Sequence, residues 1–167
     1  DLDMFARRDG VFEVWLNDGF GNFAKAHTIE SAEAADTAVT GDLDGDGDLD
    51  VLTVANPGLA IVWLNDGAGV FTASPLTDRP PQSSSAVQLA DMDGDGDLDA
   101  VVANFAAAQD EVLLNNGRGS FEATAFGPAD NSCGVAVGDI DGDGDTDVYM
   151  SHCEQNDKAD RVWLNDG

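Results

Sequence analysis

The sequence predicts an all-β fold of β-propeller blades, each with four antiparallel strands, and an incomplete ring within its 167 residues. The main observation is an internal repeat: aspartate-rich loops begin at residues 42, 91 and 139, with spacings of 49 and 48. A second segment, VWLNDG or VLLNNG, keeps the same period, at 14–19, 62–67, 112–117 and 162–167. Repeats of about 40–50 residues with short apolar stretches are typical of four-stranded propeller blades.

The second repeat illustrates the strands expected in one blade. Its apolar stretches are short, rich in Val, Ala and Leu, and bounded by Gly, Asn and Asp, which is typical of strands. The expected strands are Ala38–Thr40, Val51–Ala55, Ala60–Leu64 and Val70–Ala73. The Asn-Asp-Gly segment between the third and fourth strands predicts a tight turn, since Asn and Gly tolerate positive φ. Residues 30–36 have no apolar stripe and are expected to form a loop.

The repeat divides the chain into four units. Residues 1–29 are expected to form a partial blade with strands two to four, and residues 30–77 and 78–127 two full blades. Residues 128–167 are expected to form a partial blade with strands one to three. Since exposed strand edges tend to pair, we expect the rest of a longer chain, or further copies of this chain, to complete the end blades.

The charge of the chain is concentrated in the aspartate-rich loops. There are 33 acidic and 7 basic residues, a net charge of −26, yet 43% of the residues are hydrophobic, enough to bury a core. Seven scattered cations cannot form the basic stripe that a nucleic-acid-binding protein needs. No apolar run approaches the roughly 18–20 residues of a membrane span.

Each aspartate-rich loop has the pattern expected of a calcium site. A calcium ion takes about 6–8 oxygen ligands, and alternating aspartates in a curled loop direct carboxylates to one point. Positions 1, 3 and 5 would supply side chains, Gly at position 6 the sharp turn, position 7 a backbone carbonyl, and position 9 the closing carboxylate. The all-oxygen ligands and the flexible loop favour calcium over magnesium. The ligand residues are Asp42, Asp44, Asp46, Asp48 and Asp50; Asp91, Asp93, Asp95, Asp97 and Asp99; and Asp139, Asp141, Asp143, Asp145 and Asp147.

About three calcium ions are therefore expected, with a fourth, partial loop at Asp1 and Asp3. An EF-hand is the rival interpretation, but it requires Glu at position 12 and helices on both sides. Position 12 holds Thr53, Val102 and Met150 within strand-like runs, so the EF-hand is excluded.

The DxDGDGDxD loops and WLNDGxGxF hairpins resemble FG-GAP/VCBS repeats, the blades of integrin-α-type propellers. The resemblance covers essentially the whole chain, and it implies that the five aspartates of each loop ligate calcium. It also implies an extracellular or cell-surface module for adhesion, recognition or assembly, in which calcium has a structural role. A lectin-like or substrate-targeting propeller of a larger secreted enzyme is the alternative. An enzyme in its own right is not expected, since the sequence has no nucleophile elbow, phosphate loop, HExxH or CxxC motif.

A protein or glycan partner is expected on the face opposite the calcium loops. The loops between strands vary in length only on that face, as expected for binding loops on a fixed scaffold, although tolerated drift explains the variation equally well. The candidate segments are Asn56–Leu59, Arg79–Ser84, Phe105–Asp110 and Cys153–Asp160.

Two features concern the interior of the blades. Cys133 and Cys153 lie symmetrically about residue 143, so a symmetric hairpin would place them opposite each other. A disulfide is favoured over two buried thiols, and it agrees with an extracellular setting. Trp15, Trp63 and Trp163 recur at one repeat position and are expected to pack in the blade core.

Overall fold

The computed structural model describes residues 3–8, 11–29, 35–153 and 159–167, which contain fourteen strands and no helix. The strands form four antiparallel sheets, numbered here as blades 1 to 4. Blade 1 contains β1 (Met4–Arg8), β2 (Val11–Asn17) and β3 (Phe23–Ile29); blade 2 contains β4 (Ala35–Gly41), β5 (Asp50–Ala55), β6 (Ile61–Asn65) and β7 (Phe71–Pro75). Blade 3 contains β8 (Ser84–Ala90), β9 (Asp99–Asn104), β10 (Asp110–Asn115) and β11 (Phe121–Phe126); blade 4 contains β12 (Ser132–Gly138), β13 (Asp147–His152) and β14 (Arg161–Trp163).

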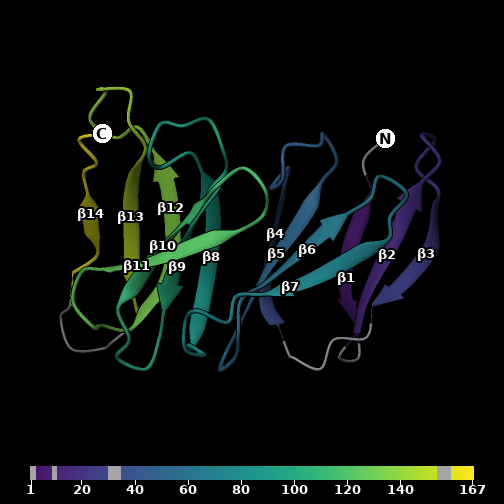
Figure 1. The fold of residues 1–167 in the computed structure, drawn as a ribbon. Helices are drawn as coiled ribbons and strands as arrows, with labels where there is room; N and C mark the ends of the chain where they lie inside the picture. The colour runs from purple at the N-terminus through teal and green to yellow at the C-terminus, as the bar shows by residue number, and fades with distance from the viewer. Residues whose placement is uncertain (1–2, 9–10, 30–34, 154–158) are drawn as a thin grey trace.

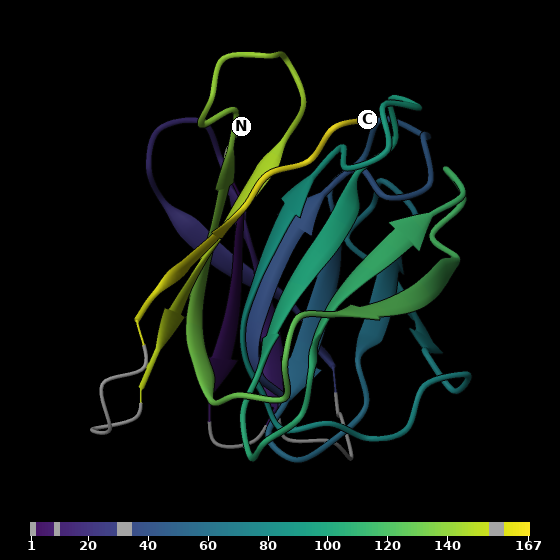
Figure 2. The same cartoon turned by 90° about the vertical axis from the view of Figure 1, so that its left-hand side faces the viewer.

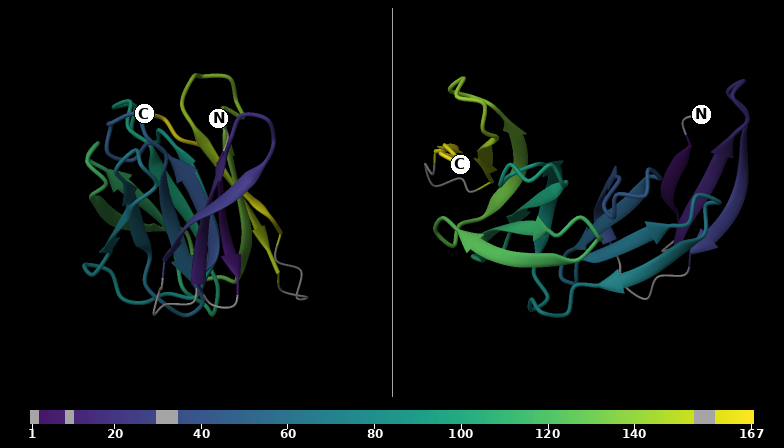
Figure 3. Two further views of the ribbon diagram at one scale, coloured as in Figure 1. Left: turned by 90° about the vertical axis from the view of Figure 1, so that its right-hand side faces the viewer. Right: turned by 45° about the horizontal axis from the view of Figure 1, so that its top comes forward.

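The prediction of an all-β, incomplete propeller is confirmed. In each blade, strands adjacent in the sequence pair with one another, without crossovers. The four sheets follow one another along an open arc, which is clearest in the right panel of Figure 3. Figure 2 looks onto blade 4 at the C-terminal end of this arc. The first strand of blade 3, β8, packs against both β4 and β12, so these first strands form the inner side of the arc.

The hydrophobic core consists of side chains between neighbouring blades. Blades 2 and 3 bury a cluster that includes Leu52, Val62 and Val102, all 0% exposed. Blades 1 and 2 are joined by an aromatic cluster in which Phe12 packs edge-on against Trp63, with ring centroids 6.0 Å apart. Because the sheets of blades 2 and 3 are each covered on both faces by neighbouring blades, their second strands β5 and β9 are buried throughout.

The expected strands of the second repeat are confirmed, with one correction at the start of the blade. Ala35 and Asp36 were expected in a loop but belong to β4, while residues 30–34 lie outside the described residues. A β-bulge between Ala35 and Thr37 makes Asp36 an extra residue in the strand. The Oδ2 atom of Asp36 accepts a hydrogen bond from the N–H of Asn56 at 2.9 Å, which holds this polar residue within a strand.

The same bulge recurs in the first strand of blades 3 and 4. It lies between Ser84 and Ala86 in β8 and between Ser132 and Gly134 in β12, so the extra residues are Ser85 and Cys133. The Ser85 hydroxyl donates to the carbonyl of Ser132 in the next blade at 2.7 Å. The bulge therefore directs one side chain per blade into a link with another part of the structure.

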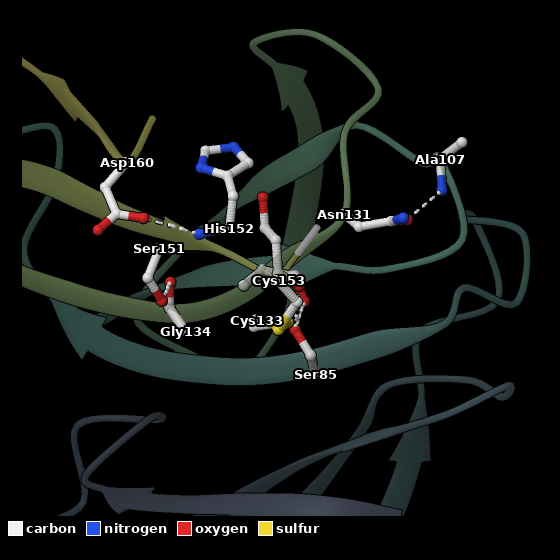
Figure 4. Close-up of a disulfide and its surroundings, with 11 residues drawn as sticks. Ser85, Ala107, Asn131, Cys133, Gly134, Ser151, His152, Cys153 and Asp160 are labelled. Atoms are coloured by element: carbon white, nitrogen blue, oxygen red, sulfur yellow. Dashed lines mark hydrogen bonds between the residues drawn. A yellow bond between two sulfur atoms is a disulfide. The ribbon is translucent and has the colours of Figure 1, made fainter. Parts of the chain in front are cut away.

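In blade 4 this link is the disulfide between Cys133 and Cys153, which confirms the predicted pairing (Figure 4). The predicted reason was wrong, because the hairpin register is not symmetric about residue 143: Gly138 pairs with Asp147. The bulge places Cys133 beside the end of β13 instead. The two Cα atoms are 5.6 Å apart, within the range that disulfides span.

We expect the double substitution Cys133→Ser, Cys153→Ser to lower the free energy of unfolding by about 3 kcal/mol, because the crosslink closes a loop with a sequence separation of 20. Urea unfolding at constant calcium concentration measures the change. Ser85→Ala, which alters the corresponding residue of blade 3 without removing a crosslink, serves as the control. Equal losses in the two proteins would contradict the expectation.

Candidate metal centres

The three aspartate-rich loops have the same backbone geometry, which begins with the carboxylate at position 1. In the first loop, Oδ1 of Asp42 accepts the N–H of Gly45 at 2.8 Å, and Oδ2 accepts the N–H of Gly47 at 3.0 Å. Asp91 and Asp139 make the corresponding bonds in the other two loops. The glycine at position 6 has a φ of 93° to 103° in the three loops, a conformation that L side chains rarely adopt. The loop therefore curls around the position 1 carboxylate.

The aspartate at position 9 connects the loop to the rest of its blade. Asp50 is fully buried; its Oδ2 accepts the N–H of Leu43 and its Oδ1 accepts the N–H of Asn65, both at 2.8 Å. Asp99 and Asp147 are also fully buried and make the same pair of bonds. One carboxylate in each of blades 2, 3 and 4 thus joins the start of the loop, the start of the second strand and the Asn-Asp-Gly or Asn-Asn-Gly turn.

Carboxylates from positions 1, 3 and 9 converge in every loop. One oxygen from each lies within 4.8 Å of the other two; the groups are Asp42, Asp44 and Asp50, then Asp91, Asp93 and Asp99, then Asp139, Asp141 and Asp147. Ligand bonds to calcium are about 2.3–2.6 Å long, so two ligands of one ion are at most about 4.6–5.2 Å apart. The residues therefore fit a hard divalent cation in each loop.

The predicted ligands at positions 5 and 7 are not part of these triads. Asp46, Asp95 and Asp143 at position 5 are exposed, and each accepts the N–H of the aspartate two residues later. At position 7, the Asp48 and Asp97 carboxylates lie directly against the backbone of Gly67 and Gly117 in the adjacent turns, and Asp145 lies near Gly167. The position 7 side chain thus faces the turn. The ligand predicted from position 7 is its backbone carbonyl, which does not require the side chain.

The partial loop at the start of the chain keeps one feature of the full loops. Oδ1 of Asp3 accepts the N–H of Asn17 at 2.8 Å, the bond that position 9 makes to the turn elsewhere. Asp1, the other predicted residue of this loop, lies outside the described residues.

Burial shifts the ionisation of the position 9 carboxylates unequally. The pKa values of Asp50 and Asp99 are raised, chiefly because burial removes water from the charged form, and nearby loop aspartates add to the effect. The pKa of Asp147 is lowered instead, by the hydrogen bonds from Asn165 and Ile140. Asp147 lies in the end blade, where fewer atoms surround it, so desolvation is weaker there.

Neighbouring blades are joined at these loops by an asparagine whose role the sequence did not reveal. Nδ2 of Asn115 in the turn of blade 3 donates to the carbonyl of Leu43 in the loop of blade 2 at 2.8 Å, and Gly119 donates to the same carbonyl at 2.7 Å. Nδ2 of Asn165 in blade 4 makes the equivalent bond to Met92 of blade 3, also at 2.8 Å. The signal was present, since all four turn segments contain this Asn, but it predicted only a turn.

The loops proposed to bind a partner lie at the opposite ends of the strands from the aspartate-rich loops, along the bottom of Figure 1. Two of the candidate segments are joined, since Gly58 and Gln82 form an isolated β-bridge. Most of the fourth segment, residues 154–158, lies outside the described residues. Arg79 was expected on this surface but is buried, with its side chain 3% exposed, in an ion pair with Glu111 that the sequence did not indicate.

Comparison with known families agrees with this architecture. A family model described as FG-GAP-like repeat matches residues 1–53, 42–102 and 91–150. No curated protein matches the sequence. Within the described part of the chain, no helix is long and apolar enough to cross a membrane.

We expect Asp99→Ala to lower the free energy of unfolding by about 2–4 kcal/mol more than Asp95→Ala, because it leaves two buried N–H groups without an acceptor. Asp95 is the matched control, since it is exposed and belongs to the same loop. Chemical denaturation at saturating calcium measures both. Similar losses in the two variants would show that position 9 has no special structural role.

Proposed function

The chain belongs to the FG-GAP-like repeat family, and on that premise we propose that it is a calcium-binding propeller module of an extracellular or cell-surface protein that serves adhesion, recognition or assembly. The observation that carries the proposal is the convergence of three carboxylates at ligand spacing in each of three loops. Calcium is favoured over magnesium because the loops offer only oxygen ligands and do not impose an octahedral cage.

The role proposed for calcium is structural and not catalytic. The position 9 carboxylate would ligate the ion while it also holds the loop and the turn, so that the ion stabilises the connection between the first and second strands of a blade. The ion would also offset the repulsion among five aspartates within nine residues. The positions 5 and 7 oxygens proposed from the sequence would complete the shell and leave no open position for a reacting group.

An extracellular location is supported by the disulfide and by the proposed metal. Disulfides persist in oxidising compartments, and extracellular calcium modules work at about 10⁻⁴–10⁻³ M calcium. We propose that a protein or glycan partner binds the face opposite the calcium loops, where Asn56–Leu59 and Phe105–Asp110 include exposed residues. We further propose that the rest of a longer chain, or further copies of this one, pack against the end blades.

Removal of calcium tests the structural role. We expect the melting temperature to fall when EDTA replaces 1 mM calcium, since an ion bound at 100 times its Kd contributes about 2.7 kcal/mol per site. Differential scanning calorimetry with calcium, with magnesium and with EDTA provides the measurement. A triple variant with Asp44→Asn, Asp93→Asn and Asp141→Asn should respond little to calcium. An identical melting temperature of the native chain in calcium and in EDTA would refute the proposal.

A further inference from the structure

A groove of about 720 Å³ lies between the outer strands of blades 2 and 3. One wall is formed by Ser74–Arg79, from the end of β7 and the segment after it, and the other by β10 and β11, which lie beside β7 in Figures 1 and 3. The volume lies within the range of about 300–1,000 Å³ typical of small-ligand sites. Because propeller blades pack at their inner strands, the space between them widens towards the outer strands.

The groove coincides with the departures of the third turn segment from the repeat. Leu113 replaces the tryptophan of the other three copies, and Asn116 replaces their aspartate; both residues line the groove. Trp63 shows the role of the tryptophan, since it packs against Phe12 of the preceding blade and its Nε1 donates to Thr53 at 3.0 Å. Leu113 is smaller than tryptophan and is fully buried in the core at the base of the groove, while Asn116 removes a negative charge from the edge of the groove.

Two buried side chains that line the groove have unused hydrogen-bonding groups. The Arg79 guanidinium pairs with Glu111 through Nη2, but its Nε and Nη1 atoms have no partner among the described residues. Oδ1 of Asn115 also has none within the described chain. In blade 2 the equivalent oxygen, on Asn65, accepts the N–H of Gly69, whereas Gly119 donates to Leu43 instead. A buried polar group without a partner is unfavourable, and a ligand group that hydrogen-bonds to it removes that cost.

We propose that this groove binds an uncharged polyhydroxyl ligand, in chemical terms a short neutral oligosaccharide. A hydroxyl group both accepts and donates, so one kind of group suits the N–H donors of Arg79 and the acceptor oxygen of Asn115. These atoms are buried just behind the lining, so ligand binding would include a small movement of both side chains towards the groove. Glu111 already balances the charge of Arg79, and Asp78 and Glu122 line the groove, so an anion is disfavoured. The inference rests on the recognition role proposed above and assigns that role a second location.

The apolar part of the lining suits the same ligand. Leu76 and Phe121 are both half-buried, and both line the groove beside Leu113. Such side chains pack against the C–H faces of sugar rings, while Ser74 and Ser120 add hydroxyl groups at the exposed margin. The lining therefore combines an apolar surface with a few polar groups of defined position.

The test uses the full chain at 1 mM calcium on a panel of immobilised uncharged oligosaccharides, followed by calorimetric titration of an oligosaccharide that binds. Ser74→Trp and Leu113→Trp fill the groove from opposite walls, and we expect each to weaken binding at least about tenfold. Thr124→Trp is the matched control, because Thr124 occupies the repeat position of Ser74 in β11, is exposed and lies outside the groove. It should change the Kd less than about twofold.

Three outcomes overturn the proposal: no binding to any neutral oligosaccharide, binding that both groove variants retain, or selection of an unglycosylated peptide in their place. Ser74 is exposed, so Ser74→Trp should not disturb the core. This variant keeps the test valid if Leu113→Trp does not fold. The calcium-dependent melting temperature is measured on the same samples. If the melting temperature depends on calcium but no oligosaccharide binds, only this inference is refuted. If the melting temperature does not depend on calcium, the proposed calcium-binding module is refuted.

Discussion

One buried carboxylate in each of blades 2, 3 and 4 holds together the parts on which the rest of the structure depends. In blade 2 it is Asp50, which accepts backbone N–H groups from the loop and from the turn while its strand continues into the core. A buried ionised group is unfavourable unless it is paired and fully hydrogen-bonded. The two N–H donors meet part of that requirement, and a cation shared with positions 1 and 3 would meet the rest. The hydrogen bonds that hold the blade together therefore also position the carboxylates of the candidate metal site.

Contacts between blades extend this arrangement along the arc. The carbonyl of Leu43 follows the first aspartate of its loop and accepts two hydrogen bonds from the next blade. Leu43 itself is buried in the core between these two blades, so the loop contributes both polar and apolar contacts to its neighbour. Because cation binding would order the loop, it would also order the surface that the following blade packs against. Stability should thus be shared between adjacent blades, as in other repeat proteins.

The sequence predicted the features that depend on local pattern. The strands, the turns and the fold class could be read from the repeat, because each blade obeys the same local rules. The contacts of Asn115 could not, since they depend on how two blades are placed relative to each other. The register of the cysteines was wrong for a related reason, because a bulge adds a residue that no alternation of side chains reveals. The buried pair of Arg79 and Glu111 could not be predicted from the period because the charges do not repeat: in blade 4 the position of Glu111 holds Arg161, which pairs with Asp130.

The recurrent bulge gives each first strand one position at which different side chains can form different kinds of link. Asp36, Ser85 and Cys133 occupy the same place in three successive first strands, and they form a bond to a backbone N–H, a bridge to the next blade and a covalent crosslink. The backbone is the same in each case, so the kind of link can vary without redesign of the blade. A change of redox environment would accordingly act on the fourth blade alone, while the second and third keep their links.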